Sequence, residues 1–175
     1  MRRSDPPSVL DHIDGLSRYA LSLTRNAEDA EDLVHDALVR ALHKRQTLRT
    51  DGDVRSWLFS ILHNAFVDNL RRRKAESARV ERASRIAPRS AEPSQEHAAE
   101  IARVQSAFGD LPTEQRAVLH LVVSEGLTYA EVAKLLNVPL GTVMSRLARA
   151  RASLRGAGES CGANPVSLRV VGGRG

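Results

Sequence analysis

The stretch from Thr128 to Arg151 reads TYAEVAKLLNVPLGTVMSRLARAR, and it decides the fold of the second half of the chain. Thr128 and Glu131 have the T-x-x-E spacing of a capping box, which predicts that a short helix begins here and ends near Leu136. Asn137 tolerates the left-handed backbone that a tight helix end requires. A second helix after a turn of three or four residues then gives the layout of a helix-turn-helix.

The second helix of this motif is predicted from about Leu140 to Leu154, and it has one apolar side. Its apolar residues fall on one side when each residue is advanced by about 100°, and they are Val143, Leu147, Ala150 and Leu154. The opposite side carries small and basic side chains, namely Ser145, Ala148, Arg149 and Ala152, flanked by Thr142, Met144 and Arg146. Small residues let a helix enter the major groove, and arginine binds guanine or phosphate. A basic solvated face on a core helix is the alternative, but the capping box, the turn and the one-sided charge together favour contact with DNA.

The composition narrows the class of protein further. The chain has 175 residues, with 26 Lys and Arg against 21 Asp and Glu, so its formal net charge is +5 and an anionic partner is expected. Aromatic residues make up only 3%, which argues against a stacking platform for single-stranded nucleic acid. The single cysteine, Cys161, excludes an internal disulfide and a cysteine-rich zinc site. No stretch approaches the roughly 20 apolar residues of a membrane span and no secretory signal is recognisable, so we expect a soluble, cytoplasmic protein.

Three further amphipathic helices are predicted in the first half of the chain, at about Ser8–Thr24, Ala27–Lys44 and Val54–Lys74. Asn26 is the expected N-cap of the second of these helices, whose first turn is acidic, as the helix dipole favours. Trp57 falls on the apolar side of the third helix and is assigned to the core. Short connections between the three helices predict a small bundle.

The sequence therefore predicts an all-α fold with two small helical domains joined by a flexible linker, the second domain containing the helix-turn-helix. We expect the first domain to cover residues 8–74 and the second to cover residues 94–155, with a helix that ends at Glu125 before the helix-turn-helix. The linker, residues 75–93, lacks a wide apolar stripe. The tail, residues 156–175, holds six of the 11 glycines and is expected to be disordered.

Three segments of the second domain resemble the C-terminal DNA-binding region of bacterial sigma factors, most closely that of the extracytoplasmic-function group. They are LPTEQR at 111–116, EGLTYAEVA at 125–133 and VPLGTVMSRL at 138–147. The first domain independently resembles the polymerase-binding and promoter-melting domain of the same group. Its motifs are DAEDLV at 29–34, RSWL at 55–58 and RRRK at 71–74. The resemblance covers about Leu10 to Arg155, with both sets of motifs in the right order.

The resemblance implies a docking surface for RNA polymerase on the second helix of the first domain. In this group that helix binds the clamp coiled coil of the largest polymerase subunit. The residues that project together here, away from the apolar stripe, are Asp32, His35, Asp36 and Val39. Residues 28–39 include five acids and neither Lys nor Arg, which suits a basic partner helix. A solvated helix start that follows the dipole rule is the alternative, and His35 stands where many relatives carry glutamine.

The resemblance also implies that the third helix and the loop before it meet the downstream (−10) promoter element. Ser60 and Asn64 lie on the side of this helix opposite the core, and phosphates would be held by Arg71, Arg72, Arg73 and Lys74. Members of the group flip a base into a pocket formed partly by the loop, which lies within residues 44–54 here. Asp68 and Arg72, four residues apart, are a candidate surface pair.

The last helix would read the upstream (−35) promoter element. Its candidate contacts are Thr142, Met144, Ser145, Arg146, Ala148, Arg149 and Arg151. By motif position, Ser145 and Arg149 are the best candidates for base edges, with Met144 and Ala148 beside them, while Arg146 and Arg151 are expected to reach phosphates. Relatives often carry a basic residue at Met144 and a bulkier one at Ala148, which indicates a different upstream sequence rather than a different function.

Together these features predict a sigma factor that binds core RNA polymerase, through its clamp and flap, and directs initiation at specific promoters. The resemblance implies a role in a stress or envelope response, control by an anti-sigma protein and a monomeric state when free of partners. A stand-alone helix-turn-helix regulator that binds duplex operators is the alternative, although it would usually need to dimerise. No metal-binding histidine pair or phosphate-binding loop of known spacing occurs, so we expect no metal, no cofactor, no membrane insertion and no enzymatic activity.

Overall fold

The computed structural model describes residues 9–44, 53–79 and 106–159, which form helices and the short connections between them, without a strand. The chain divides into two compact units, Met1–Pro88 and Arg89–Gly175, and each is described by itself. The all-α fold class predicted from the sequence is confirmed. No helix in the described part is both long enough and apolar enough to cross a bilayer.

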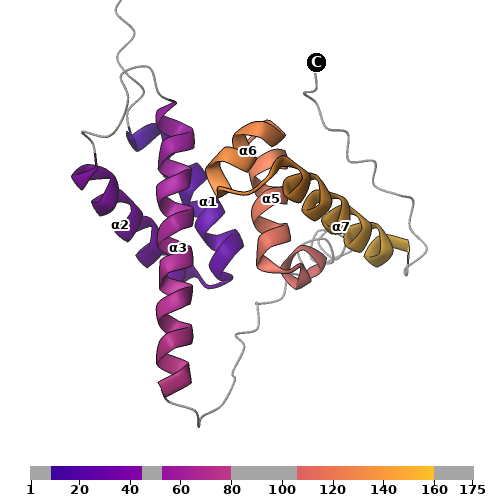
Figure 1. Cartoon of the computed structure of the whole chain (residues 1–175), viewed down its shortest axis with the longest axis horizontal. Coiled ribbons are helices and arrows are strands. Elements are labelled where there is room, and N and C mark those ends of the chain that lie inside the picture. Colours follow the sequence, from indigo (N-terminus) through magenta and orange to yellow (C-terminus); the bar gives the residue numbers. More distant parts are fainter. Residues whose placement is uncertain (1–8, 45–52, 80–105, 160–175) are drawn as a thin grey trace, which may run out of the picture. The chain divides into compact units, whose positions relative to one another are not determined.

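The first unit is a three-helix bundle. A short 3-10 helix, η1 (Val9–His12), leads into α1 (Ile13–Thr24), which is followed by α2 (Ala27–His43) and α3 (Val54–Arg79). α1 packs against α2 and α2 packs against α3, while α1 also contacts α3 (Figure 1). The largest side chains in its closed core are Leu16, Tyr19, Leu58, Phe59 and Leu62. The three helices predicted in this half of the chain are therefore present.

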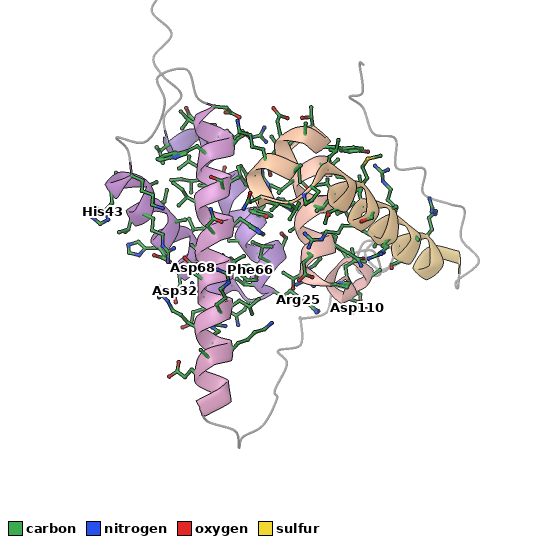
Figure 2. The ribbon with its side chains drawn as sticks, in the orientation of Figure 1. Arg25, Asp32, His43, Phe66, Asp68 and Asp110 are labelled. Carbon is green, nitrogen blue, oxygen red and sulfur yellow. The ribbon has the colours of Figure 1, made fainter. Side chains whose placement is uncertain are left out.

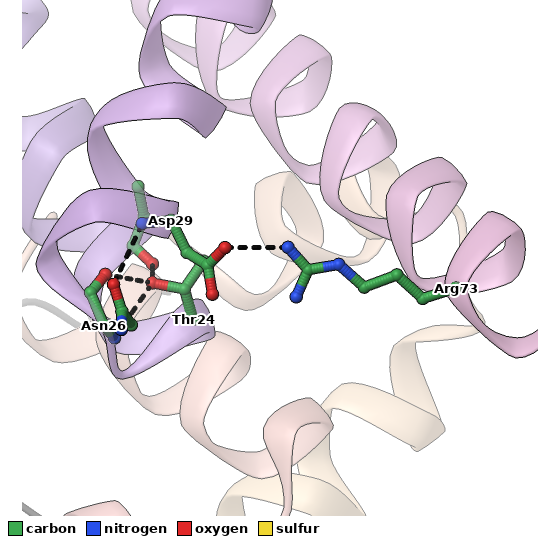
Figure 3. Close-up of polar contacts among 5 residues, drawn as sticks. Thr24, Asn26, Asp29 and Arg73 are labelled. Carbon is green, nitrogen blue, oxygen red and sulfur yellow. Dashed lines mark hydrogen bonds and ion pairs between the residues drawn. The ribbon is translucent and has the colours of Figure 1, made fainter. Parts of the chain in front are cut away.

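Three consecutive polar residues build the turn between α1 and α2. Arg25 closes α1 with a left-handed backbone (φ 60°), and its N–H donates to the Leu21 carbonyl at 2.9 Å. The Asn26 side chain accepts a hydrogen bond from the Asp29 N–H at 3.0 Å and is thus the predicted N-cap of α2. The Thr24 hydroxyl donates to the Asn26 carbonyl at 3.0 Å (Figure 3). This turn sets where α2 begins, and so sets the register of its acidic face.

Asp53 caps the start of α3. Its carboxylate accepts hydrogen bonds from the Arg55 N–H at 3.0 Å, the Ser56 N–H at 3.3 Å and the Ser56 hydroxyl at 2.5 Å. Burial by itself raises the pKa of Asp53, but the hydrogen bonds from Ser56 and Arg55 outweigh burial and hold that pKa below its ordinary value. The carboxylate therefore stays charged at the positive end of the helix dipole.

α3 is longer than predicted, because it continues to Arg79 instead of ending at Lys74. The first part of the predicted linker, residues 75–79, is therefore helical, and residues 80–93 lie outside the described residues. The segment 75–79 reads AESAR and contains neither glycine nor proline, so nothing in its composition ends the helix.

The second unit contains α5 (Thr113–Val123), α6 (Tyr129–Leu136) and α7 (Leu140–Glu159), after a helical segment of which residues 106–110 are described. Both α5 and α6 pack on α7 (Figure 1). The core between them comprises Leu111, Val118, Leu121, Val132, Val143 and Leu147. α7 is thus held from one side, which leaves the other side available to a partner.

α5 ends at Val123, two residues before the predicted end at Glu125. The Leu127 N–H reaches back to the Leu121 carbonyl at 3.1 Å, as in a helix end closed by a left-handed residue. Gly126 supplies that residue, with a φ of 65° that a side chain would make unfavourable. The chain therefore leaves the helix earlier than the apolar pattern indicates.

α6 and α7 form the predicted helix-turn-helix. The Glu131 N–H donates to the Thr128 hydroxyl at 3.3 Å, and the Thr128 N–H donates to the Glu131 carboxylate at 2.7 Å, so both halves of the capping box are present. Asn137 adopts the left-handed backbone (φ 53°), and the Val138 N–H donates to the Ala133 carbonyl at 3.0 Å. The local signals that predicted this motif are confirmed.

A buried arginine that the sequence analysis did not single out holds the start of α5. The Arg116 guanidinium donates to the Gly109 carbonyl at 3.0 Å, to the Leu111 carbonyl and to the Thr113 hydroxyl at 3.2 Å. These two carbonyls end the preceding helical segment, where intrahelical donors run out. Arg116 thereby ties that segment to α5.

α7 is also longer than predicted, because it ends at Glu159 and not near Leu154. Residues 156–159, which the sequence analysis placed in the tail, therefore belong to α7, and residues 160–175 lie outside the described residues. The glycines of this segment lower helix propensity by about 1 kcal/mol each relative to alanine, which weakens a helix without preventing it.

Candidate nucleic-acid and partner interfaces

The predicted docking surface on α2 is largely presented to solvent. Asp32, His35 and Val39 are exposed, and Asp36 is half-buried. The opposite side of α2 is buried against the bundle through Ala30, Leu33, Val34, Ala37 and Ala41. We call Asp32, His35, Asp36 and Val39 the docking strip.

Leu42 extends this strip toward the carboxyl end of α2. Its side chain is 69% exposed. Leu42 follows Val39 by three residues, so the two lie on neighbouring turns of the helix. His43, the last residue of α2, points away from the other helices (Figure 2). The carboxyl end of α2 thus presents apolar surface that nothing else in the described first unit covers.

Asp36 is engaged within the first unit through a bridge that links α2 to α3. Arg40 Nε lies 3.0 Å from Asp36 Oδ1, and Arg40 Nη1 lies 2.9 Å from Asp68 Oδ2 on α3. The hydrogen bonds to Asp36 and then to Asp68 raise the pKa of Arg40 above its ordinary value. Asp68 (Figure 2) therefore pairs across the bundle, and not with Arg72 on its own helix as proposed from spacing.

A second ion pair joins the same two helices. Arg73 Nη2 lies 2.7 Å from Asp29 Oδ1, in the first turn of α2 (Figure 3). The hydrogen bond to Asp29 raises the pKa of Arg73 above its ordinary value. All four predicted phosphate contacts, Arg71, Arg72, Arg73 and Lys74, are exposed, but Arg73 is already paired with a carboxylate.

The predicted DNA-facing side of α3 is only partly open to solvent. Asn64 is exposed, whereas Ser60 is half-buried and its hydroxyl donates to the Trp57 carbonyl at 2.7 Å. Trp57 itself is half-buried, so its indole is not part of the closed core to which the sequence assigned it. The loop expected to form a base pocket falls mainly on residues 45–52, outside the described residues.

His63 has a structural contact that the sequence did not reveal. Tyr19 Oη lies 3.0 Å from His63 Nδ1, and the two rings stack with centroids 6.3 Å apart. Burial raises the pKa of the Tyr19 phenol, so the phenol stays protonated. This pair ties α1 to α3.

The exposed face of α7 gathers most of the predicted upstream contacts. Met144, Ser145, Ala148 and Arg149 are exposed, and Thr142 and Arg146 are half-buried at the side of the face. The buried side of the helix carries Val143, Leu147 and Ala150. Because the two sets lie on opposite sides, one helix can pack on its own unit and reach a partner at the same time.

Arg151 differs from the other basic candidates of α7. It is half-buried, and its Nη2 atom is buried without a hydrogen-bond partner among the described residues. A guanidinium in that position faces its own unit more than solvent. Arg149 is consequently the better exposed arginine for a base edge, while Arg146 is half-buried at the side of the face.

Two known families match the two halves of the chain. Residues 9–76 match the family described as Sigma-70 region 2, and residues 101–154 match the family described as Sigma-70, region 4. The first match covers the three-helix bundle with the docking strip. The second match covers the helix-turn-helix and most of α7.

Individual proteins agree with these family matches. The chain is 31% identical to the ECF RNA polymerase sigma factor EcfG of Rhodopseudomonas palustris over 95% of its own length and 94% of that protein. It is 41% identical to the ECF RNA polymerase sigma factor SigM of Mycobacterium tuberculosis, over 79% and 69% of the two chains. Among solved structures it resembles the sigma factor RpoE of Bartonella quintana, crystallised in complex with the anti-sigma factor NepR. That match has a TM-score of 0.72 and 27% identity, and covers 87% of this chain and 95% of the other.

Proposed function

Because the chain belongs to the sigma-70 family, and within it to the extracytoplasmic-function group of sigma factors, we propose that it binds core RNA polymerase and directs initiation at specific promoters. Sigma factors are transcription initiation factors and are not known as enzymes. The observation that carries the proposal is that one chain contains both a docking strip on α2 and an exposed basic face on the second helix of a helix-turn-helix.

Upstream promoter recognition is assigned to α7. The exposed Ser145 and Arg149 would contact base edges, with Met144 and Ala148 beside them, and Arg146 would reach a phosphate. Arg151 is a weaker candidate, because it lies against its own unit. This assignment concerns the second domain, which we propose extends beyond residue 155 to the end of α7.

Downstream promoter recognition is assigned to α3. Asn64 is exposed on the face opposite the core, and Arg71, Arg72 and Lys74 form an exposed basic cluster about two to three turns later. Such a cluster would hold phosphates and contribute affinity more than sequence preference. Arg73 would join it after exchanging Asp29 for a phosphate.

Polymerase binding is assigned to the docking strip together with Leu42. Asp32 is an exposed carboxylate, and Val39 and Leu42 add apolar surface that a partner helix could bury. Asp36 contributes less directly, because Arg40 holds its carboxylate. The partner would be the clamp of the largest subunit, with the polymerase flap binding the second domain.

Control by an anti-sigma protein is part of the proposal. The related RpoE of Bartonella quintana is bound by an anti-sigma factor, and the exposed apolar end of α2 offers a surface that such a partner could cover. A protein that acts on promoters together with RNA polymerase works in the cytoplasm.

A reconstituted transcription assay tests the proposed function. The purified full chain, mixed with core polymerase and a library of bacterial promoter fragments, should produce run-off transcripts from defined start sites. Reactions without the chain or without core polymerase are the controls, and the chain alone should bind duplex DNA only weakly. Tight duplex binding by the chain alone, without a polymerase-dependent transcript, would support a stand-alone regulator instead.

A further inference from the structure

The exposed face of α7 has two chemically different edges. An α-helix turns about 100° per residue, so residues at positions i and i+4 follow one another along one edge. Leu140 and Met144 lie along the first edge, and Thr142, Arg146 and Arg149 lie toward the second. Between the edges stand three small residues, Gly141, Ser145 and Ala148. Over residues 140–149 the face is therefore apolar on one side and basic on the other, and Arg151 and Arg155 continue the first edge further along the helix.

The apolar edge is unusually open for side chains of this size. Met144 is 53% exposed and Leu140 is 48% exposed, whereas Val143 and Leu147 on the same helix are buried. The exposed pair occupies the first two turns of α7, and these are the turns of a helix-turn-helix that reach base edges. An apolar group there makes the free energy of binding more favourable only when it contacts apolar surface on the partner.

The charge around this edge indicates which partner that is. Exposed or half-buried Arg146, Arg149 and Arg155 share α7 with it, and Lys134 is exposed on α6. The nearest acid in sequence, Glu131, has its carboxylate engaged by Thr128 in the capping box. The partner is thus a polyanion that nevertheless offers an apolar patch, and duplex DNA does so in the major groove through the 5-methyl group of thymine.

We propose that Met144 is a specificity-determining residue that packs on the 5-methyl group of a thymine in the upstream promoter element, with Leu140 beside it. The inference rests on the proposed function and deepens it, since it assigns a base to a residue. The small residues in the middle of the face let the helix approach the base edges.

Uracil substitution tests this contact, because uracil differs from thymine only by lacking that methyl group. Duplex DNA is selected from a random library by the full chain, once with and once without core polymerase. Each thymine of the selected element is then replaced singly by uracil. For the wild-type chain, one replacement should weaken binding about fourfold, the effect of withdrawing one methyl group from an apolar contact.

The Met144→Ala variant supplies the second arm of the test. It should bind the thymine-containing element about fourfold more weakly than the wild type, and it should no longer distinguish thymine from uracil at that position. Val123→Ala is the matched control, because Val123 is 48% exposed but lies on α5, and it should retain the full uracil effect. Circular dichroism of the three proteins checks that the fold is intact.

Two results would overturn the inference. The contact is excluded if no thymine in the selected element weakens binding when it is replaced by uracil. It is also excluded if the Met144→Ala variant shows the same uracil effect as the wild type. If Met144→Ala weakens core polymerase binding and leaves base preference unchanged, the edge is a protein-docking surface instead. Failure of the proposed function would give a different result from failure of the Met144 contact. The chain would then select the same DNA with and without core polymerase, and no transcript would be produced.

Discussion

Asp36 and Arg73 show that a predicted contact residue can already have a partner in its own chain. The Asp36 carboxylate lies 3.0 Å from Arg40 Nε, and Arg73 Nη2 lies 2.7 Å from Asp29 Oδ1. Binding to polymerase or phosphate then requires that one ionic partner be exchanged for another. Surface pairs of this kind contribute only about 0–1 kcal/mol, so an exchange is feasible. Asp32 and Arg149 are exposed and have no ion pair among the described residues, which makes them the sharper test positions.

Arg149→Ala should change the preference for one base pair of the upstream element. Losing a base-edge contact costs about 1–3 kcal/mol at the contacted pair and little at the others. Binding of the holoenzyme to promoters with every single base-pair change measures this pattern. Arg155→Ala removes the same charge further along α7 and should weaken binding uniformly, with a smaller salt dependence. A uniform loss for Arg149→Ala would make Arg149 a phosphate contact.

At the scale of elements, α2 and α3 are joined by polar bridges as well as by the core. Arg40 links Asp36 on its own helix to Asp68 on α3, and Asp29 binds Arg73 further along α3. The helix proposed to hold polymerase is thereby attached to the helix proposed to hold the downstream element. We infer that the bridges help to keep the docking strip and the DNA-facing side of α3 in a constant relative orientation.

A double-mutant cycle measures the bridge. Arg40→Gln, Asp68→Asn and the double variant should give a coupling free energy of about 0.2–1 kcal/mol in urea unfolding, as for partly exposed ion pairs. The coupling should shrink as salt is added. The matched cycle uses Arg72→Gln with Asp68→Asn and should show coupling near zero. A larger coupling for Arg72 than for Arg40 would restore the pair that spacing alone suggested.

At the scale of the whole molecule, two compact units carry two kinds of proposed contact. The docking strip belongs to the first unit and the helix-turn-helix belongs to the second, so binding to the polymerase clamp and choice of upstream sequence are separable by mutation. Neither unit alone contains both the docking strip and the helix-turn-helix. Promoter-specific initiation is therefore a property of the intact chain bound to core polymerase.

Asp32→Arg should lower the affinity for core polymerase while leaving the choice of upstream sequence unchanged. The substitution places positive charge where a basic partner helix is expected, and like charges across an interface repel. Titration of labelled core polymerase measures the affinity, and promoter competition within the remaining holoenzyme measures the choice. Asp14→Arg makes the same change of charge on α1 and serves as control. Unchanged polymerase binding by Asp32→Arg would contradict the docking assignment.

Interactions between near neighbours in the chain were predictable. The Thr128–Glu131 capping box, the Asn26 cap and the left-handed Asn137 join residues no more than five positions apart, so their spacing is visible in the sequence. The helical period likewise indicated which side of α2 and of α7 faces the core, because it too depends on residues close together in the chain. Helix ends were less predictable: α3 and α7 run on because no strong terminator follows, and α5 stops early at the turn closed by Gly126.

The sequence by itself determined the helices, the helix-turn-helix, the polarity of each face and, through its motifs, the family. Only the tertiary structure decided which of the candidate side chains are paired, half-buried or open. Arg40 meets Asp68 across 28 positions and Arg73 meets Asp29 across 44, and the packing around α2 and α7 leaves Leu42 exposed while it half-buries Arg151. These outcomes depend on how three helices pack together. A periodic pattern records which side of a helix is apolar, but not which charge on a neighbouring helix comes within 3 Å of it.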